Sequence, residues 1–148
     1  MFSYSLMYKL FSIFLGFLIL NSCVQETNPN TFLKQIGVDL EDDYVVISLE
    51  NSQAIGDLLV NFDLKLGEIG YDLVIQNIKN HESFRILDSL ECYPNGLIQN
   101  TSSRQEFSCK RNNIFYKHLY KPISGSDWES YTLFVDQDSI LEFQYVNE

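Results

Sequence analysis

The strongest constraint on the fold is a change in the spacing of apolar side chains near residue 67. Within residues 57–66 apolar and polar residues alternate, as in a strand with one face in water. Apolar residues then recur at helical spacing, at Tyr71, Val74, Ile75 and Ile78. This spacing predicts an amphipathic helix of about three turns over residues 70–80. A one-sided strand followed by a one-sided helix indicates a helix packed on one face of an antiparallel sheet.

The rest of the chain adds a short helical turn and several strands. Residues 31–36 are expected to form the turn, with Asn30 as its N-cap and Gly37 at its end. Strand patterns occupy residues 44–49, 105–110, 114–121, 128–135 and 140–146. The last two are expected to form a hairpin in which Tyr131, Leu133 and Val135 pair with Leu141, Phe143 and Tyr145. The predicted fold is α+β: a single small domain, residues 31–148, with an antiparallel sheet and one or two helices packed on one face.

The amino-terminal segment has the three parts of an export signal. Lys9 gives a weakly positive start, an apolar run follows to Leu20, and the small residue Ser22 precedes Cys23. Leu20, Ser22 and Cys23 resemble the lipid-attachment box of bacterial lipoprotein precursors. The resemblance covers the first 23 residues and implies that residues 1–22 are removed and that Cys23 carries diacylglycerol. An ordinary cleaved signal, or an uncleaved membrane anchor formed by residues 1–20, would be the alternative interpretations.

A lipid on Cys23 would hold the domain near a membrane. Val24 to Asn30 form a short tether, which spans at most about 25 Å when extended. Val24 stands where enteric lipoproteins retained in the inner membrane carry Asp, so the resemblance favours the outer membrane of a bacterial cell envelope. The membrane is then one expected partner, reached through Cys23.

The charge of the chain restricts its other partners. The formal net charge is −10, and removal of residues 1–22 takes away only Lys9, which leaves nine basic against twenty acidic residues. Such a surface disfavours nucleic acid and anionic lipid. The acidic residues Asp42, Asp43 and Asp63 fall in one region of the sequence and are candidates for binding a basic protein partner in the envelope.

Cys92 and Cys109 are the two cysteines that follow Cys23. An even pair in an exported chain predicts a disulfide, which would stabilise the fold by about 3 kcal/mol in the chain-entropy model. The alternative is a reactive thiol with His118 as its base, which no local sequence signature supports.

An aromatic row marks a second candidate surface. Tyr116, His118 and Tyr120 share one parity of a strand, whereas Phe115, Lys117 and Leu119 share the other. One set must face the core. Tyrosine and cationic side chains are typical anchors in protein interfaces. The same aromatic residues, with Trp128, would also suit a glycan or another small ligand.

No motif in the sequence names a chemical reaction. Neither histidine has metal-ligand spacing, and the chain has no Gly-x-Ser-x-Gly elbow and no phosphate-binding glycine loop. The spacing of Asp136 and Asp138 is interpreted as an Asp-rich hairpin turn rather than a calcium loop. We therefore expect no catalytic residues, metal or cofactor. The sequence favours a membrane-anchored, non-catalytic protein-binding module of the accessory-subunit or immunity type, with a small-ligand or glycan binder as the alternative and a small hydrolytic enzyme third.

Overall fold

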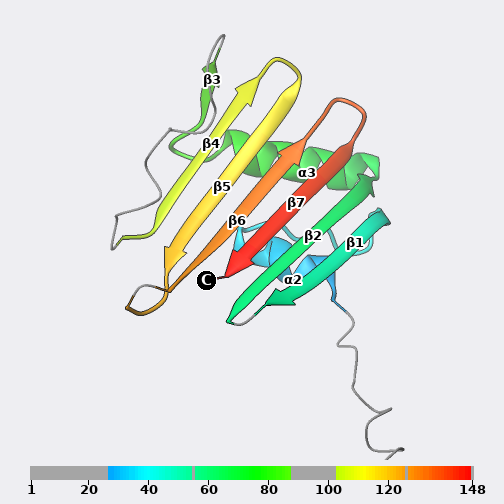
Figure 1. Ribbon diagram of the computed structural model, residues 1–148. Helices are drawn as coiled ribbons and strands as arrows, with labels where there is room; N and C mark the ends of the chain where they lie inside the picture. Colours follow the sequence, from blue (N-terminus) through cyan, green and yellow to red (C-terminus); the bar gives the residue numbers. More distant parts are fainter. Residues whose placement is uncertain (1–26, 55, 88–102, 126, 148) are drawn as a thin grey trace, which may run out of the picture.

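A seven-stranded sheet with two helices on one of its faces makes up the part of the chain that the structure describes (Figure 1). The structure is a computed structural model, and it describes residues 27–54, 56–87, 103–125 and 127–147. The helices are α2 (Pro29–Gln35) and α3 (Glu68–Lys79). The strands are β1 (Tyr44–Ala54), β2 (Asp57–Leu66), β3 (Arg85–Leu87), β4 (Gln105–Arg111), β5 (Ile114–Pro122), β6 (Trp128–Val135) and β7 (Ile140–Asn147).

The strand order is β1-β2-β7-β6-β5-β4-β3, so the α+β prediction holds. The expectation of a wholly antiparallel sheet is wrong at one edge, because β3 pairs with β4 in parallel and the sheet is mixed. The chain between Leu87 and Gln105 is longer than the dozen or so residues that a parallel crossover needs. The other neighbouring strands are antiparallel.

The closing hairpin has the predicted register. Tyr131 lies opposite Tyr145, Leu133 opposite Phe143 and Val135 opposite Leu141. All six side chains are buried, and they face the helices. The alternation of β2 also holds, with Val60, Phe62, Leu64 and Leu66 in the core.

The helix predicted over residues 70–80 begins two residues earlier, at Glu68. Val74, Ile75 and Ile78 are buried against the sheet, as their spacing predicts. Gly70 lies so close to β1 that an added Cβ would stand 2.8 Å from the main-chain oxygen of Asp43. Glycine is therefore needed there for the helix to approach the sheet.

The first helix and strand both differ from the sequence prediction at their ends. Asn28, not Asn30, is the N-cap of α2, and Pro29 is at the start of the helix. The Asn30 side chain instead accepts a hydrogen bond from Leu40 N at 3.2 Å. Strand β1 continues beyond Leu49 to Ala54, because its polar second half pairs with the first half of β2. Polar residues therefore do not end a strand when the neighbouring strand continues beside them.

Aromatic packing joins α2 to the centre of the sheet. Phe62 of β2 stacks on Phe143 of β7 with ring centroids 4.5 Å apart and planes at 12°. Phe32 of α2 lies against both rings and against Tyr145. The two helices and the sheet thus share one core on one side of the sheet, and the other face has no described helix over it (Figure 1).

Replacement of Leu133 by Ala is expected to lower the free energy of unfolding by about 2–5 kcal/mol, because this fully buried side chain lies in the middle of the sheet. Ile69→Ala is the control, since Ile69 is 70% exposed on α3, and its effect should be within about 0.5 kcal/mol. Urea unfolding followed by Trp128 fluorescence measures both. Equal effects for the two variants would contradict the assignment of the core.

Candidate binding surface on the open face of the sheet

Tyr116, His118 and Tyr120 lie together on the face of the sheet that carries no described helix, which we call the open face. The alternate residues Phe115 and Leu119 are buried in the core on the helix side. The register continues the open face across neighbouring strands: Tyr116 lies opposite Phe134, His118 opposite Thr132 and Tyr120 opposite Ser130. The sequence predicted that the three residues share a face, and the strand pairing shows which face it is.

His118 is not an exposed contact residue. Its side chain is 2% exposed, its Nδ1 lies 2.9 Å from Thr132 Oγ1, and its ring stacks on Phe107. Burial disfavours the charged imidazolium and lowers the pKa of His118 to about 4. The ring is therefore neutral near pH 7, and such a low pKa makes it a weak general base there.

The aromatic residues proposed for a glycan site do not form one platform. Tyr120 is only 7% exposed, and its ring packs 5.8 Å from that of Trp128. Tyr116 is four residues away on the same strand, which is about 13 Å. Of the three, Tyr116 and Trp128 are partly exposed.

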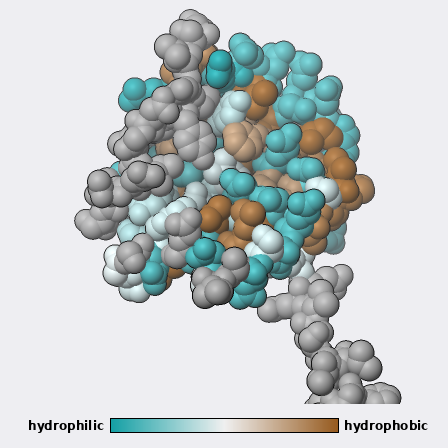
Figure 2. Space-filling model, in the orientation of Figure 1, coloured by the Kyte–Doolittle hydropathy of each residue, from teal (hydrophilic) through white to brown (hydrophobic). Residues whose placement is uncertain are grey.

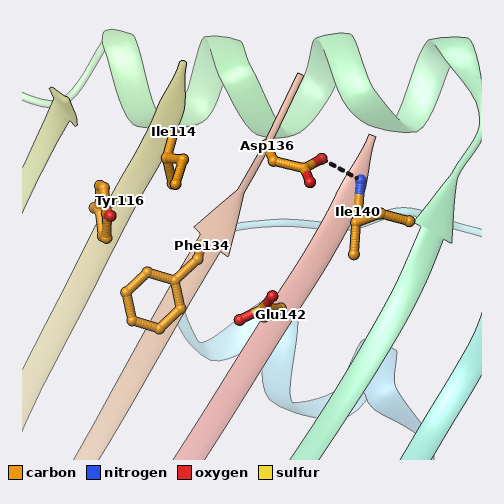
Figure 3. A pocket seen from close by; sticks show the side chains of 6 residues that line it. All are labelled: Ile114, Tyr116, Phe134, Asp136, Ile140 and Glu142. Carbon is orange, nitrogen blue, oxygen red and sulfur yellow. Dashed lines mark hydrogen bonds between the residues drawn. The ribbon is translucent and has the colours of Figure 1, made fainter. Parts of the chain in front are cut away.

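A shallow hollow of about 250 Å³ opens at the end of this face where β5, β6 and β7 meet their turns (Figure 3). Tyr116 and Phe134 meet edge to face at 4.9 Å and 87°. Ile114 and Ile140 supply further apolar surface, and two carboxylates complete the lining. The lining residues are Ile114, Tyr116, Phe134, Asp136, Ile140 and Glu142.

The two acidic residues of the hollow have different roles. Asp136 Oδ1 accepts hydrogen bonds from the backbone N–H groups of Asp138 and Ile140, each at 2.9 Å. Figure 3 shows the bond to Ile140. Asp136 therefore holds the β6–β7 turn, in agreement with the hairpin interpretation. No group of three or more candidate metal ligands occurs within the described residues.

Glu142 instead adds negative charge to the open face. It lies directly opposite Asp63 in the β2–β7 register, and like charges in that position destabilise a sheet. Asp63 Oδ2 accepts a hydrogen bond from Ser48 Oγ at 2.7 Å, whereas Lys65 donates to the main-chain oxygen of Asp138. Among the described residues, no ion pair involves Asp63 or Glu142.

The three acidic residues predicted as a binding region have different structural surroundings. Asp43 Oδ2 accepts a hydrogen bond from Gly70 N at 2.6 Å, and the main-chain oxygen of Asp43 accepts one from Gly67 N at 2.9 Å. Gly67, the N-cap residue of α3, has no side chain to cap the helix. Asp43 is thus the capping group of α3, Asp42 is exposed in the preceding turn, and Asp63 lies on the open face.

A buried ionic cluster on the helix side was not predicted. Lys117 is 4% exposed, and its Nζ lies 3.1 Å from Glu106 Oε1 and 2.6 Å from Asn77 Oδ1 on α3. Arg104 and His81 also contact Glu106, at 3.0 and 3.3 Å. Burial opposes ionisation of Glu106, but hydrogen bonds from Arg104 and Lys117 outweigh it and lower the pKa of the carboxyl group. The sequence pattern placed Lys117 on a strand but gave no sign of a partner on α3.

His81 also connects this cluster to a serine. Its Nδ1 lies 2.7 Å from Ser83 Oγ, and its Nε2 lies 3.3 Å from Glu106. A serine, a histidine and a carboxylate in this sequence of contacts resemble a catalytic relay. The Ser83 hydroxyl oxygen, however, accepts a hydrogen bond from Ser108 N at 2.9 Å, beside the β3–β4 pairing. The arrangement is explained by its structural role, which is to attach the end of α3 to the sheet.

Three predictions concern residues that the structure does not describe: the signal at residues 1–22, the lipid on Cys23, and the disulfide between Cys92 and Cys109. Cys23, with its lipid, and Cys92 both lie outside the described residues. Cys109 is 3% exposed on β4, opposite Tyr116, and its disulfide with Cys92 stays a prediction. Within the described part of the chain, no helix is long and apolar enough to cross a bilayer.

Comparisons with protein-family models, curated proteins and solved structures return no match. The function must therefore be argued from the geometry of this chain.

Asp43→Ala is expected to lower the free energy of unfolding by about 1 kcal/mol, because the N–H of Gly70 loses its acceptor. Asp42→Ala is the matched control, since Asp42 is the exposed neighbour. Urea unfolding of both variants measures the difference. If the two variants were equally stable, Asp43 would have no capping role.

The stability of the fold is also expected to fall as the pH drops from about 6.5 toward 4, because the unfolded chain then binds a proton that buried His118 does not. The difference of about 2.5 pKa units corresponds to about 3 kcal/mol at most. Denaturant unfolding at several pH values measures this slope. His118→Gln should flatten it between pH 6.5 and 4, and an unchanged slope would exclude His118 as its source.

Proposed function

We propose that this chain is a lipid-anchored binding module of the bacterial cell envelope that recognises a protein partner without catalysis. The resemblance of Leu20, Ser22 and Cys23 to a lipoprotein box supports the anchor. Val24 after the modified cysteine favours the outer membrane. An accessory subunit and an immunity or inhibitor protein are the two forms of this proposal.

The observation that carries the proposal is the hollow in which Tyr116, Phe134 and Glu142 meet, with Asp63 opposite Glu142 on the next strand. Partly exposed Tyr116 and Phe134 offer aromatic surface, which is enriched at the anchor positions of protein interfaces. The two opposed carboxylates repel one another until a cation approaches. The complementary partner is a protein segment with an apolar side chain next to Lys or Arg.

A small ligand or glycan is the second candidate, and the dimensions of the hollow argue against it. Ligand pockets usually enclose roughly 300–1,000 Å³. The hollow holds only about 250 Å³. The burial of Tyr120 also removes one of the aromatic faces on which a sugar ring would stack.

Glu142→Lys is expected to weaken partner binding, because it reverses the exposed charge beside the hollow. The expected loss of binding free energy at a central interface contact is about 2 kcal/mol, which raises the Kd roughly 30-fold. Glu82→Lys is the control, since Glu82 is exposed near the end of α3. Crosslinked pull-down from native envelopes identifies the partner, and titration of that partner against both variants measures the Kd.

Cys23→Ala provides the unanchored reference in the same pull-down. A stoichiometric protein that requires both Cys23 and Glu142 would support the proposal. A partner that Glu142→Lys binds as tightly as the unsubstituted chain does would exclude the open face as the interface. If no protein were enriched, ligand binding would become the better explanation.

A further inference from the structure

Strand β1 exposes a row of apolar side chains at one edge of the sheet. Val45 is 67% exposed, Ile47 56%, Val46 44% and Leu49 39%. No described strand lies beyond β1 (Figure 1). Figure 2 shows hydrophobic surface gathered on the side of the molecule where β1 lies. Apolar side chains exposed together along one strand are candidates for a contact with a protein or a membrane.

The backbone of β1 is poorly suited to receive another strand. The β1–β2 register shifts between Val46 and Ser48, which leaves Ile47 at a bulge. Bulges of this kind interrupt the regular hydrogen-bonding edge and protect it from strand addition. A partner would therefore contact the apolar side chains of β1 rather than its backbone N–H and C=O groups. This favours a partner that does not need to pair with β1 as another strand. A lipid surface has this property.

The start of the described chain is fixed to the same strand. The Asn51 side-chain amide donates a hydrogen bond to Thr27 Oγ1 at 3.2 Å. Thr27 follows Cys23 by four residues, a distance of at most about 14 Å. Leu49 is two residues from Asn51, and Val45 is about 20 Å from it along the strand. A lipid on Cys23 would thus enter the bilayer within reach of the apolar edge.

We propose that the apolar edge of β1 rests on the bilayer, so that the sheet stands edge-on to the membrane and the open face remains accessible to a partner. This inference rests on the lipid anchor of the proposed function. The short tether keeps the edge near the lipid surface, and the four apolar side chains lose contact with water there.

The charges near β1 define the type of lipid. Glu41 and Asp42 are exposed just before the strand, and Glu50 is exposed within it. Strand β1 contains no Lys or Arg to attract an anionic headgroup. The contact therefore suits zwitterionic lipid, and anionic lipid should weaken it.

Quenching by brominated lipid tests this orientation in the full lipidated chain. Ile47→Trp and, separately, Ile86→Trp are made in a Trp128→Phe background and reconstituted in nanodiscs of brominated phosphatidylcholine. Ile86 is the matched control, because it is 71% exposed on β3 at the opposite edge of the sheet. Relative to nanodiscs of unbrominated lipid, the Ile47→Trp variant should lose most of its fluorescence and the Ile86→Trp variant should keep most of it. Val45→Trp serves as a second reporter if Ile47→Trp does not fold.

The outcomes separate this inference from the proposed function. The mass of the amino-terminal peptide shows whether Cys23 carries lipid. Lipid on Cys23 with equal quenching at both edges, or with none, would overturn the β1 contact and leave the anchor intact. Lack of lipid on Cys23 would overturn both. An emission shift of Ile47→Trp that grows with protein concentration, without quenching, would assign the edge to a second copy of the chain. Stronger quenching in phosphatidylglycerol nanodiscs would overturn the preference for zwitterionic lipid.

Discussion

The pairing of β2 with β7 is the interaction on which the rest of the structure depends. It joins a hairpin from the first half of the domain to the strand that ends the described chain. The stacked rings of Phe62 and Phe143 lie opposite one another in this pairing, and Phe32 brings α2 onto them. Without it, the β1–β2 hairpin would be separate from the other strands, and the open face would lose Asp63.

Charged side chains on the two faces of the sheet differ in their partners. On the helix side, Lys117 is buried, and Glu106 and Asn77 supply the partners that a buried ammonium group requires. On the open face, Asp63 and Glu142 stand opposite one another without an ion-pair partner among the described residues. The first arrangement is complete within the domain, whereas the second leaves two like charges opposite one another.

Sequence reasoning succeeded where a single periodicity decides the outcome. Side-chain spacing alone predicts that Val74 and Ile78 face the core, and it also predicts the register of the β6–β7 hairpin. It failed where the answer depends on a residue distant in sequence. In the sequence Asp43 is one of several acidic residues in a turn. Its role as the cap of α3 becomes visible only in the structure, where the N-cap residue Gly67 has no side chain. The parallel direction of β3 likewise depends on the path of the chain between β3 and β4, which composition does not determine.

The candidate site shows the same division. The alternation of side chains along a strand placed Tyr116, His118 and Tyr120 on one face. Burial of each side chain also depends on its neighbours on other strands. The pattern could therefore not distinguish partly exposed Tyr116 from buried His118. The hollow was not predicted either. Its walls come from the ends of three strands, and only the sheet order brings Ile114 near Ile140.

The position of β7 also has a consequence for the order in which the chain can fold. The ribosome completes β2 before β7, so β2 has its β1 partner on one side and an unsatisfied edge on the other until β7 has also been made. The domain therefore cannot close its sheet while its carboxyl-terminal strand is still being made. A chain that closes this late would remain easy to thread, unfolded, through a narrow translocation channel.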